Sequence, residues 1–160
     1  MNSRQTLETL LAQFAQAAGI SGEPLNEQGV AAIGFDQDIV VNVAAYDVSD
    51  LLHLFATLGL VPDDDEAMHH AMQLALCFNR DLIGIRSGAI GLTPDEREFV
   101  LSTCLPLANL TAEEFSLHLL AFAELCRQAR IYLAEAPTML LEGIAEQTQE
   151  EAPPDFAAFV

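Results

Sequence analysis

Two adjacent histidines, His69 and His70, are the side chains in this sequence that come nearest to a metal-ligand pattern. They follow Asp65 and Glu66 by one helical turn, and a carboxylate and an imidazole at positions i and i+4 can bind a divalent ion. Adjacent residues of a helix point about 100° apart, so the two rings cannot easily face one ion. We therefore expect surface helix pairing here and no metal site.

The other candidates for catalysis lack a partner of the right type. Gly84, Gly88 and Gly91 lie close in sequence, but a phosphate-binding loop also needs a Lys and a strand that leads into a helix. Glu113 and Glu114 could act as a general acid and base, yet both fall in the first turn of a predicted helix, where the dipole already favours carboxylates. The sequence therefore predicts a protein with no catalytic residues and no cofactor.

The charge is strongly acidic, with 24 Asp and Glu against six Lys and Arg and a formal net charge of −18. A charge of this sign repels phosphate backbones and anionic lipid, which argues against nucleic acid and membrane surfaces as partners. We find no signal-peptide pattern and no apolar run long enough for a membrane span. Cys77, Cys104 and Cys126 lack metal-ligand spacing, so we expect buried thiols in a reducing cytoplasm.

The first part of the chain predicts one helix followed by three strands. Apolar residues at helical spacing predict a helix over 4–18, with Ser3 as its N-cap and Gly19 as its stop. Three apolar runs follow, and short polar breaks separate them. They cover 30–35, 39–46 and 51–58 and predict a three-stranded antiparallel meander.

A second helix is predicted after Pro62, because four carboxylates at 63–66 suit the positive end of a helix dipole. It should run to about residue 79. Its apolar residues cover more than one side, which indicates two neighbours, its own sheet and a candidate second subunit. They are Met68, Ala71, Met72, Leu74, Ala75, Leu76, Cys77 and Phe78.

The last part of the chain predicts a hairpin and a long helix. The runs 89–92 and 99–105 flank a turn sequence at 93–96. Thr111 and Glu114 then form a capping box, with Leu110 and Phe115 as its hydrophobic staple. Beyond Pro137 we expect the order to decay. The result is one α+β domain over 1–136 and an acidic, flexible tail over 137–160.

The abundance of apolar residues suggests exposed grooves that another chain fills. A second interpretation is that Leu7, Leu11 and Phe14 simply cover the sheet, since periodicity alone does not show which side of a helix faces solvent.

The order of elements, the length and the acidity resemble the class I chaperones of bacterial type III secretion, the Tir chaperone family. The most specific stretch is 89–133. It contains Ala-Ile-Gly-Leu-Thr-Pro-Asp-Glu from Ala89, a strand that ends in Leu-Pro-Leu at Leu107, and a capped helix that starts after Asn109. The similarity covers about residues 3–134 and rests on structural motifs, which indicate fold more strongly than function.

The resemblance implies a homodimer in the bacterial cytoplasm that binds the N-terminal segment of a secreted effector and keeps it soluble, partly unfolded and secretion-competent. The secretion ATPase is a further candidate partner. The family dimerises through its second helix, which carries over to Ala71, Met72, Ala75 and Phe78. Effector segments contact the first helix and the sheet, which carries over to Leu7, Leu11, Phe14, Ile33, Phe35 and Val41.

An alternative function keeps the same fold. An acidic regulatory adaptor could bind a folded, basic protein by charge mimicry. Strong salt dependence of binding would favour the adaptor, because apolar contacts respond weakly to salt.

Overall fold

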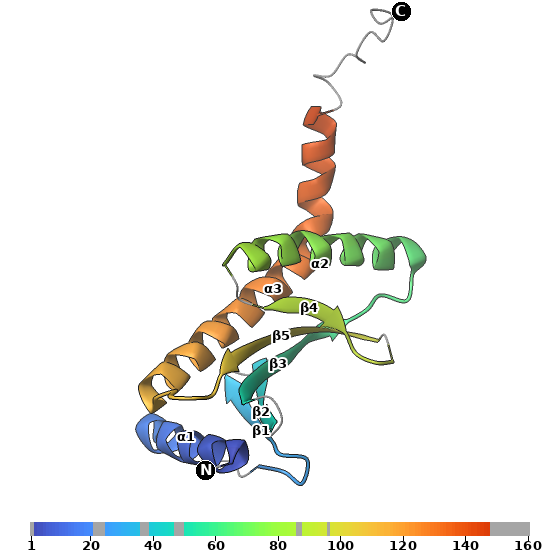
Figure 1. The fold of residues 1–160 in the computed structure, drawn as a ribbon. Coiled ribbons are helices and arrows are strands. Elements are labelled where there is room, and N and C mark those ends of the chain that lie inside the picture. Colours follow the sequence, from blue (N-terminus) through green and yellow to red (C-terminus); the bar gives the residue numbers. More distant parts are fainter. Residues whose placement is uncertain are drawn as a thin grey trace, which may run out of the picture.

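The computed structural model describes residues 2–20, 25–35, 39–46, 50–85, 88–95 and 97–147, and of residues 46, 83–85 and 135–147 it describes the backbone alone. The helices and strands follow one another in the predicted order (Figure 1). Their bounds are α1 Ser3–Ala18, β1 Val30–Phe35, β2 Ile39–Tyr46, β3 Leu51–Leu60, α2 Asp65–Ile85, β4 Ala89–Leu92, β5 Glu98–Pro106 and α3 Ala112–Gln147.

The predicted meander and hairpin join into one five-stranded antiparallel sheet with the order β1-β2-β3-β5-β4. The joint is the pairing of β3 with β5, in which Leu54 lies opposite Thr103. A register shift between Thr57 and Gly59 marks a bulge near the end of β3, where the carbonyl of Thr57 accepts a 2.9 Å bond from Arg130 of α3. Strands β1 and β4 are therefore the two edges of the sheet.

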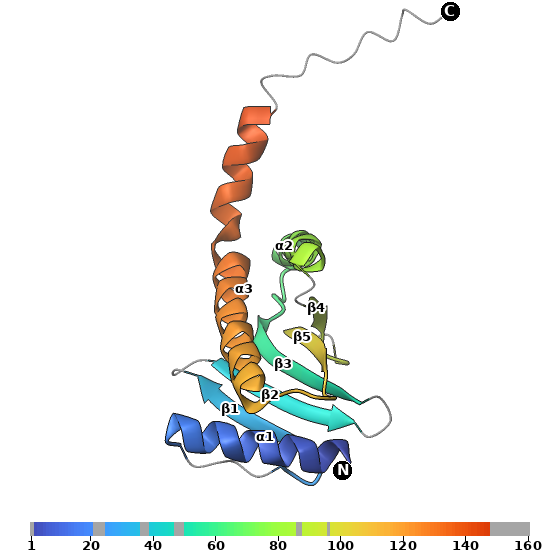
Figure 2. The ribbon, with the colours of Figure 1, turned by 60° about the vertical axis from the view of Figure 1, so that its left-hand side comes forward.

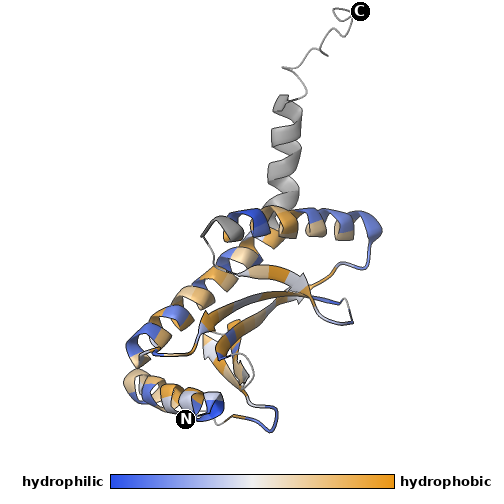
Figure 3. Ribbon diagram, viewed as in Figure 1, coloured by the Kyte–Doolittle hydropathy of each residue, from blue (hydrophilic) through white to orange (hydrophobic). Residues whose placement is uncertain are grey.

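The hydrophobic core lies between one face of the sheet and the helices α1 and α3 (Figure 2). Strand β3 shows the reason, because its side chains alternate between buried and half-buried, as expected when one face of a strand is covered. Aromatic rings join the two helices, with Phe14 of α1 edge-on to Phe115 of α3 at a centroid distance of 6.2 Å. Figure 3 shows the strands predominantly apolar and the helices mixed, which is the pattern of helices that bury one stripe.

Local capping explains where the helices begin. Asn2, and not the predicted Ser3, is the N-cap of α1, and its side chain accepts a 2.8 Å bond from the N–H of Gln5. Ser3 is buried and donates to Asp50. The capping box of α3 is confirmed, since the Glu114 carboxylate accepts from the backbone N–H of Thr111 at 3.0 Å and the N–H of Glu114 donates back to the Thr111 hydroxyl at 3.2 Å.

Two helices are longer than predicted. Helix α2 continues past 79 to Ile85, and α3 continues through Pro137 to Gln147, where we expected the order to decay. Pro137 removes one backbone donor, and the neighbouring backbone bonds can carry the helix past it at some cost. Residues 148–160 lie outside the described residues, so the flexible tail stays a prediction.

Candidate functional site

The side chains predicted to bind an effector lie in the core of the protomer. Leu7 and Val41 have no exposed surface, and Leu11 is 7% exposed. Ile33 lies opposite Val41, and both point toward the helices. The interpretation that the first helix covers the sheet is therefore the correct one, and the expected exposed patch of Leu7, Leu11, Phe14, Ile33 and Val41 is wrong; Phe35 is half-buried beside them.

The opposite face of the same strands is the surface that remains available. We call it the open face. One row crosses the whole sheet, from Ala32 of β1 through Asn42, Phe55 and Ser102 to Ala89 of β4, each residue paired with the next. None of the five is buried. The open face also contains Val40, His53, Thr57, Val100 and Cys104.

The ten named residues of the open face carry no charge at neutral pH, in a chain whose net charge is −18. Glu98, the first residue of β5, is the one acidic side chain in the strands, and its alternation with Val100 places it at the end of the same face. The apolar members of the open face include Val40, which is 50% exposed, and the half-buried Phe55. His53 lies against Phe55 with ring centroids 5.1 Å apart, and partial burial lowers the pKa of His53 below its ordinary 6.5, which favours the neutral ring. A nearly uncharged surface of apolar and small polar side chains on so acidic a protein is suited to contact apolar side chains of a partner.

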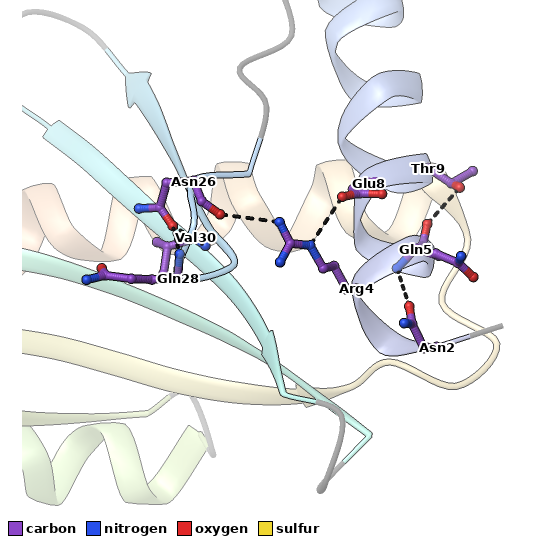
Figure 4. A network of polar contacts seen from close by, with 8 residues as sticks. All are labelled: Asn2, Arg4, Gln5, Glu8, Thr9, Asn26, Gln28 and Val30. Atoms are coloured by element: carbon purple, nitrogen blue, oxygen red, sulfur yellow. Dashed lines mark hydrogen bonds and ion pairs between the residues drawn. The ribbon is translucent and has the colours of Figure 1, made fainter.

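The β1 edge borders the open face and is open along most of its length. Val30 is bonded at both backbone groups by Asn26, whose side chain accepts from the Val30 N–H at 2.9 Å and whose N–H donates to the Val30 carbonyl at 2.9 Å. Arg4 of α1 ties this turn to the helix through the Asn26 carbonyl at 3.3 Å (Figure 4). On an edge strand, backbone N–H and C=O groups point outward at every second residue. The backbone groups of Ala32 and Gly34 therefore also point away from β2, and no described residue bonds to them.

The β4 edge is closed at its centre. The side chain of Asn79 on α2 accepts from the N–H of Ile90 at 2.6 Å and donates to the carbonyl of Ile90 at 2.9 Å. These two bonds replace those that a further strand would make. Sequence reasoning missed Asn79, because nothing local marks an Asn within a helix as the partner of a strand 11 residues away.

An apolar groove of about 200 Å³ lies between α2 and β4. The predicted dimer residues Met72 and Ala75 line it, although Ala75, like Ala71, is also buried in the core of the protomer. The ring of Phe78 packs against Tyr132 at a centroid distance of 5.3 Å and a tilt of 46°. The remaining lining residues are Leu76, Asn79, Ile90, Gly91, Leu92 and Phe99, and none is charged. Leu76 stands at the rim with 69% of its surface exposed.

The thiols and imidazoles do not assemble into a reactive site. No cluster of three or more His, Cys, Asp or Glu that could hold a metal occurs among the described residues. His69 pairs with Gln73 at 3.0 Å on the surface of α2. Of the three cysteines expected to be buried, only Cys126 is, and burial raises its pKa to about 12; Cys77 and Cys104 are exposed.

None of the helices in the described ranges combines the length and the apolar character that crossing a bilayer requires.

A model of the Tir chaperone protein (CesT) family matches residues 9–130, about three quarters of the chain. The chain belongs to this family. The matched residues begin within α1 and end within α3, so they include the whole sheet, the open face and the groove. A search of curated proteins found no match. As a Tir-family chaperone the protein is not an enzyme, in keeping with the sequence-based prediction.

Solved structures share the fold of this Tir-family chain. The crystal structure of the ExsC–ExsE complex superposes with a TM-score of 0.69 at 22% identity, over 83% of this chain and 97% of the other. The structure of the HopA1–SchA chaperone–effector complex gives 0.64 at 16% identity, over 80% and 95%. The Yersinia pestis type III secretion chaperone SycH, in complex with a fragment of YscM2, gives 0.52 at 16% identity, over 76% and 98%.

Proposed function

We propose that this chaperone binds the N-terminal segment of a type III secreted effector in the bacterial cytoplasm and keeps the segment soluble, partly unfolded and secretion-competent. The observation that carries the proposal is the open face, whose one charged side chain is Glu98 at the end of β5, next to a strand edge on which Ala32 and Gly34 have no backbone partner among the described residues. An extended segment could bond to Ala32 and Gly34 and place alternate side chains beside them on the open face, where Val40, the partner of Gly34, is the next residue across the sheet. We thereby propose the effector contact on the open face of the strands and not on their buried face, where the sequence predicted it.

We further propose that the chaperone is a homodimer joined through the groove between α2 and β4. The groove is a hollow, and Leu76 projects from its rim, so one patch offers both a knob and a hole. A twofold interface needs this self-complementarity, because each copy presents the same patch. The absence of charge among its lining residues also limits repulsion between two copies of charge −18. On family membership alone we add the secretion ATPase as a predicted partner.

The test of client binding uses the secreted protein encoded beside the gene for this chain. Co-expression should yield a complex in which protease spares the N-terminal segment of that protein. Val40→Asp should abolish the complex, because it places a charge on the open face. Ile131→Asp on α3 is the matched control, since Ile131 is 49% exposed and Val40 is 50% exposed, and it should leave the complex intact.

Two results would count against this function. Equal binding by Val40→Asp and wild type would remove the open face as the effector site. The acidic adaptor would be favoured over the chaperone if binding falls steeply between low and high salt and the Val40→Asp variant binds as tightly as wild type.

A further inference from the structure

Helix α2 packs into the core through Ala71, Ala75 and Leu82, and two neighbouring residues add specific contacts to the rest of the protomer. On one side, Phe78 packs its ring on Tyr132 of α3. On the other side, Asn79 bonds to both backbone groups of Ile90 in β4. One residue turns a helix by about 100°, so these contacts point in different directions and together fix both the position and the rotation of α2.

The position of β4 is equally constrained. Gly88, which precedes β4, has a φ of 121°, and a Cβ on it would lie 2.3 Å from the carbonyl oxygen of Ser102 in β5. No other residue type fits there without moving the backbone. β4 is therefore held against β5 on one edge and against Asn79 on the other.

Asn79 also lies in the groove whose two walls it connects. Met72, Ala75 and Leu76 form the helical wall, and Ile90, Gly91 and Leu92 form the strand wall. The amide of Asn79 spans from one wall to the other with bonds of 2.6 and 2.9 Å. The separation of the walls, and hence the width of the groove, depends on these bonds.

We propose that Asn79 is a positioning residue for the dimer: it sets the spacing between α2 and β4 and so keeps the groove in the shape that a second copy of the chain occupies. The inference rests on the dimer surface proposed above. Without Asn79 the direct bonds between the two walls are lost and only the core packing of α2 and β4 holds their spacing, so the spacing varies more and association must first select the right arrangement. The apparent dissociation constant then rises in inverse proportion to the population of that arrangement.

Three substitutions at Asn79 separate positioning from direct contact. Asn79→Ala removes both bonds, Asn79→Leu removes both but keeps a side chain of similar volume in the groove, and Asn79→Asp keeps only the acceptor for the Ile90 N–H. We expect the dissociation constant to rise about tenfold for Ala and Leu alike, since each leaves two backbone groups without their partner. Asn79→Asp should raise it at least about threefold but also adds a charge to the groove, so the uncharged Asn79→Leu is the variant that tests the same point if Asn79→Ala does not fold.

Two controls make the measurement decisive. Val43→Ala removes buried volume from the core at a residue that does not line the groove, so it should lower the melting temperature and leave dimerisation unchanged. Leu76→Asp alters the exposed knob and should dissociate the dimer without loss of fold. Sedimentation equilibrium over a concentration series, at a temperature where circular dichroism shows every variant folded, measures all the dissociation constants.

The outcomes are distinguishable. If Leu76→Asp leaves the dimer intact, the proposed dimer surface is wrong. If Leu76→Asp dissociates the dimer while the Asn79 variants stay within twofold of wild type, the surface stands and the role of Asn79 is overturned. A rise for Asn79→Ala but not for Asn79→Leu would assign Asn79 to direct contact, and an equal rise for Val43→Ala would assign the effect to general instability; either contradicts positioning.

Discussion

The two edges of the sheet differ in where their outward backbone groups have hydrogen-bond partners. Each edge has an asparagine that bonds to both backbone groups of one strand residue, Asn26 at Val30 and Asn79 at Ile90. On β4, which has four residues, that contact lies in the middle of the strand and a helix lies alongside it. On β1, which has six, the contact lies at the first residue, and Ala32 and Gly34 follow without a partner among the described residues.

The open face extends to both edges, but only the β1 edge leaves successive backbone groups to which a further strand could bond. An unpaired edge invites strand addition, and proteins usually block such edges with charge, Pro or a covering element. Here the open face reaches both edges, and the blocked edge is the one that also adjoins the groove. An added strand at β1 would receive backbone bonds from the edge and side-chain contacts from the open face, which together provide affinity and selectivity.

The largest effect is expected from Leu11→Asp, which tests whether the helix behind β1 is core or binding surface. Leu11 is 7% exposed, and a carboxylate there would be buried without a partner. We expect a loss of about 4 kcal/mol or more in the free energy of unfolding, measured by urea denaturation. The control is Leu120→Asp, at a residue that is 55% exposed on α3, with a change near zero. A folded Leu11→Asp variant that loses only its effector would restore the first helix as the binding site.

Amide hydrogen exchange compares the two edges directly. The N–H of Ala32 has no acceptor among the described residues, whereas the N–H of Ile90 is bonded to Asn79 at 2.6 Å. Without a client, we expect the Ala32 amide to exchange at least about 100-fold faster than the Ile90 amide, because exchange at Ile90 first requires that the bond open. Addition of the client should slow exchange at Ala32 and leave Ile90 unchanged. Equal rates in the free protein would contradict the contrast between the edges.

Ala32→Pro removes a hydrogen-bond donor from the β1 edge without removing a hydrogen bond of the sheet. Proline removes the outward N–H, and it is tolerated on an edge strand where that group faces solvent. The lost hydrogen bond and the added bulk of the proline ring should together weaken client binding about 30-fold, as measured by calorimetry. Ala32→Ser retains the N–H and should bind like wild type. Undiminished binding by the proline variant would show that the client does not extend the sheet at β1.

The smallest effect is expected at a site far from both edges, the capping box of α3. Backbone and side-chain bonds from Thr111 lower the pKa of Glu114 below its ordinary value of 4.5. A lowered pKa contributes stability above the ordinary value, and this contribution is lost as the pH falls through the lowered one. Glu114→Gln should therefore lower the melting temperature by about 2 °C at pH 7 and by less in acid. A difference that does not depend on pH would contradict a role for the ionised carboxylate, and client binding should be unaffected throughout.

Much of the fold was predictable because its signals are local. The strand bounds 30–35, 39–46 and 89–92, the capping box at Thr111 and the turn after Leu92 all depend on residues close in sequence. The N-cap Asn2 was missed by one residue, as is usual where several capping residues lie together. The end of α2 was missed by six residues, since the helix continues from 79 to Ile85. The pairing of β3 with β5 was not predicted, because it joins residues about 50 apart.

The binding surface was predicted on the wrong face for a similar reason. The sequence shows that Ile33 and Val41 face one way and Ala32 and Val40 the other, since strand side chains alternate. Both sets are apolar, so alternation alone does not show which one the helices cover.

The sequence by itself determined the elements, the acidic surface and the family, because these depend on composition, periodicity and short-range capping. Tertiary structure alone decided which strand face is buried, which edge is closed and where the groove lies. Those features come from contacts such as Phe14 with Phe115 and Asn79 with Ile90. Such contacts form only when α1, α2 and α3 pack on the sheet, and no local pattern specifies on which side each helix will lie.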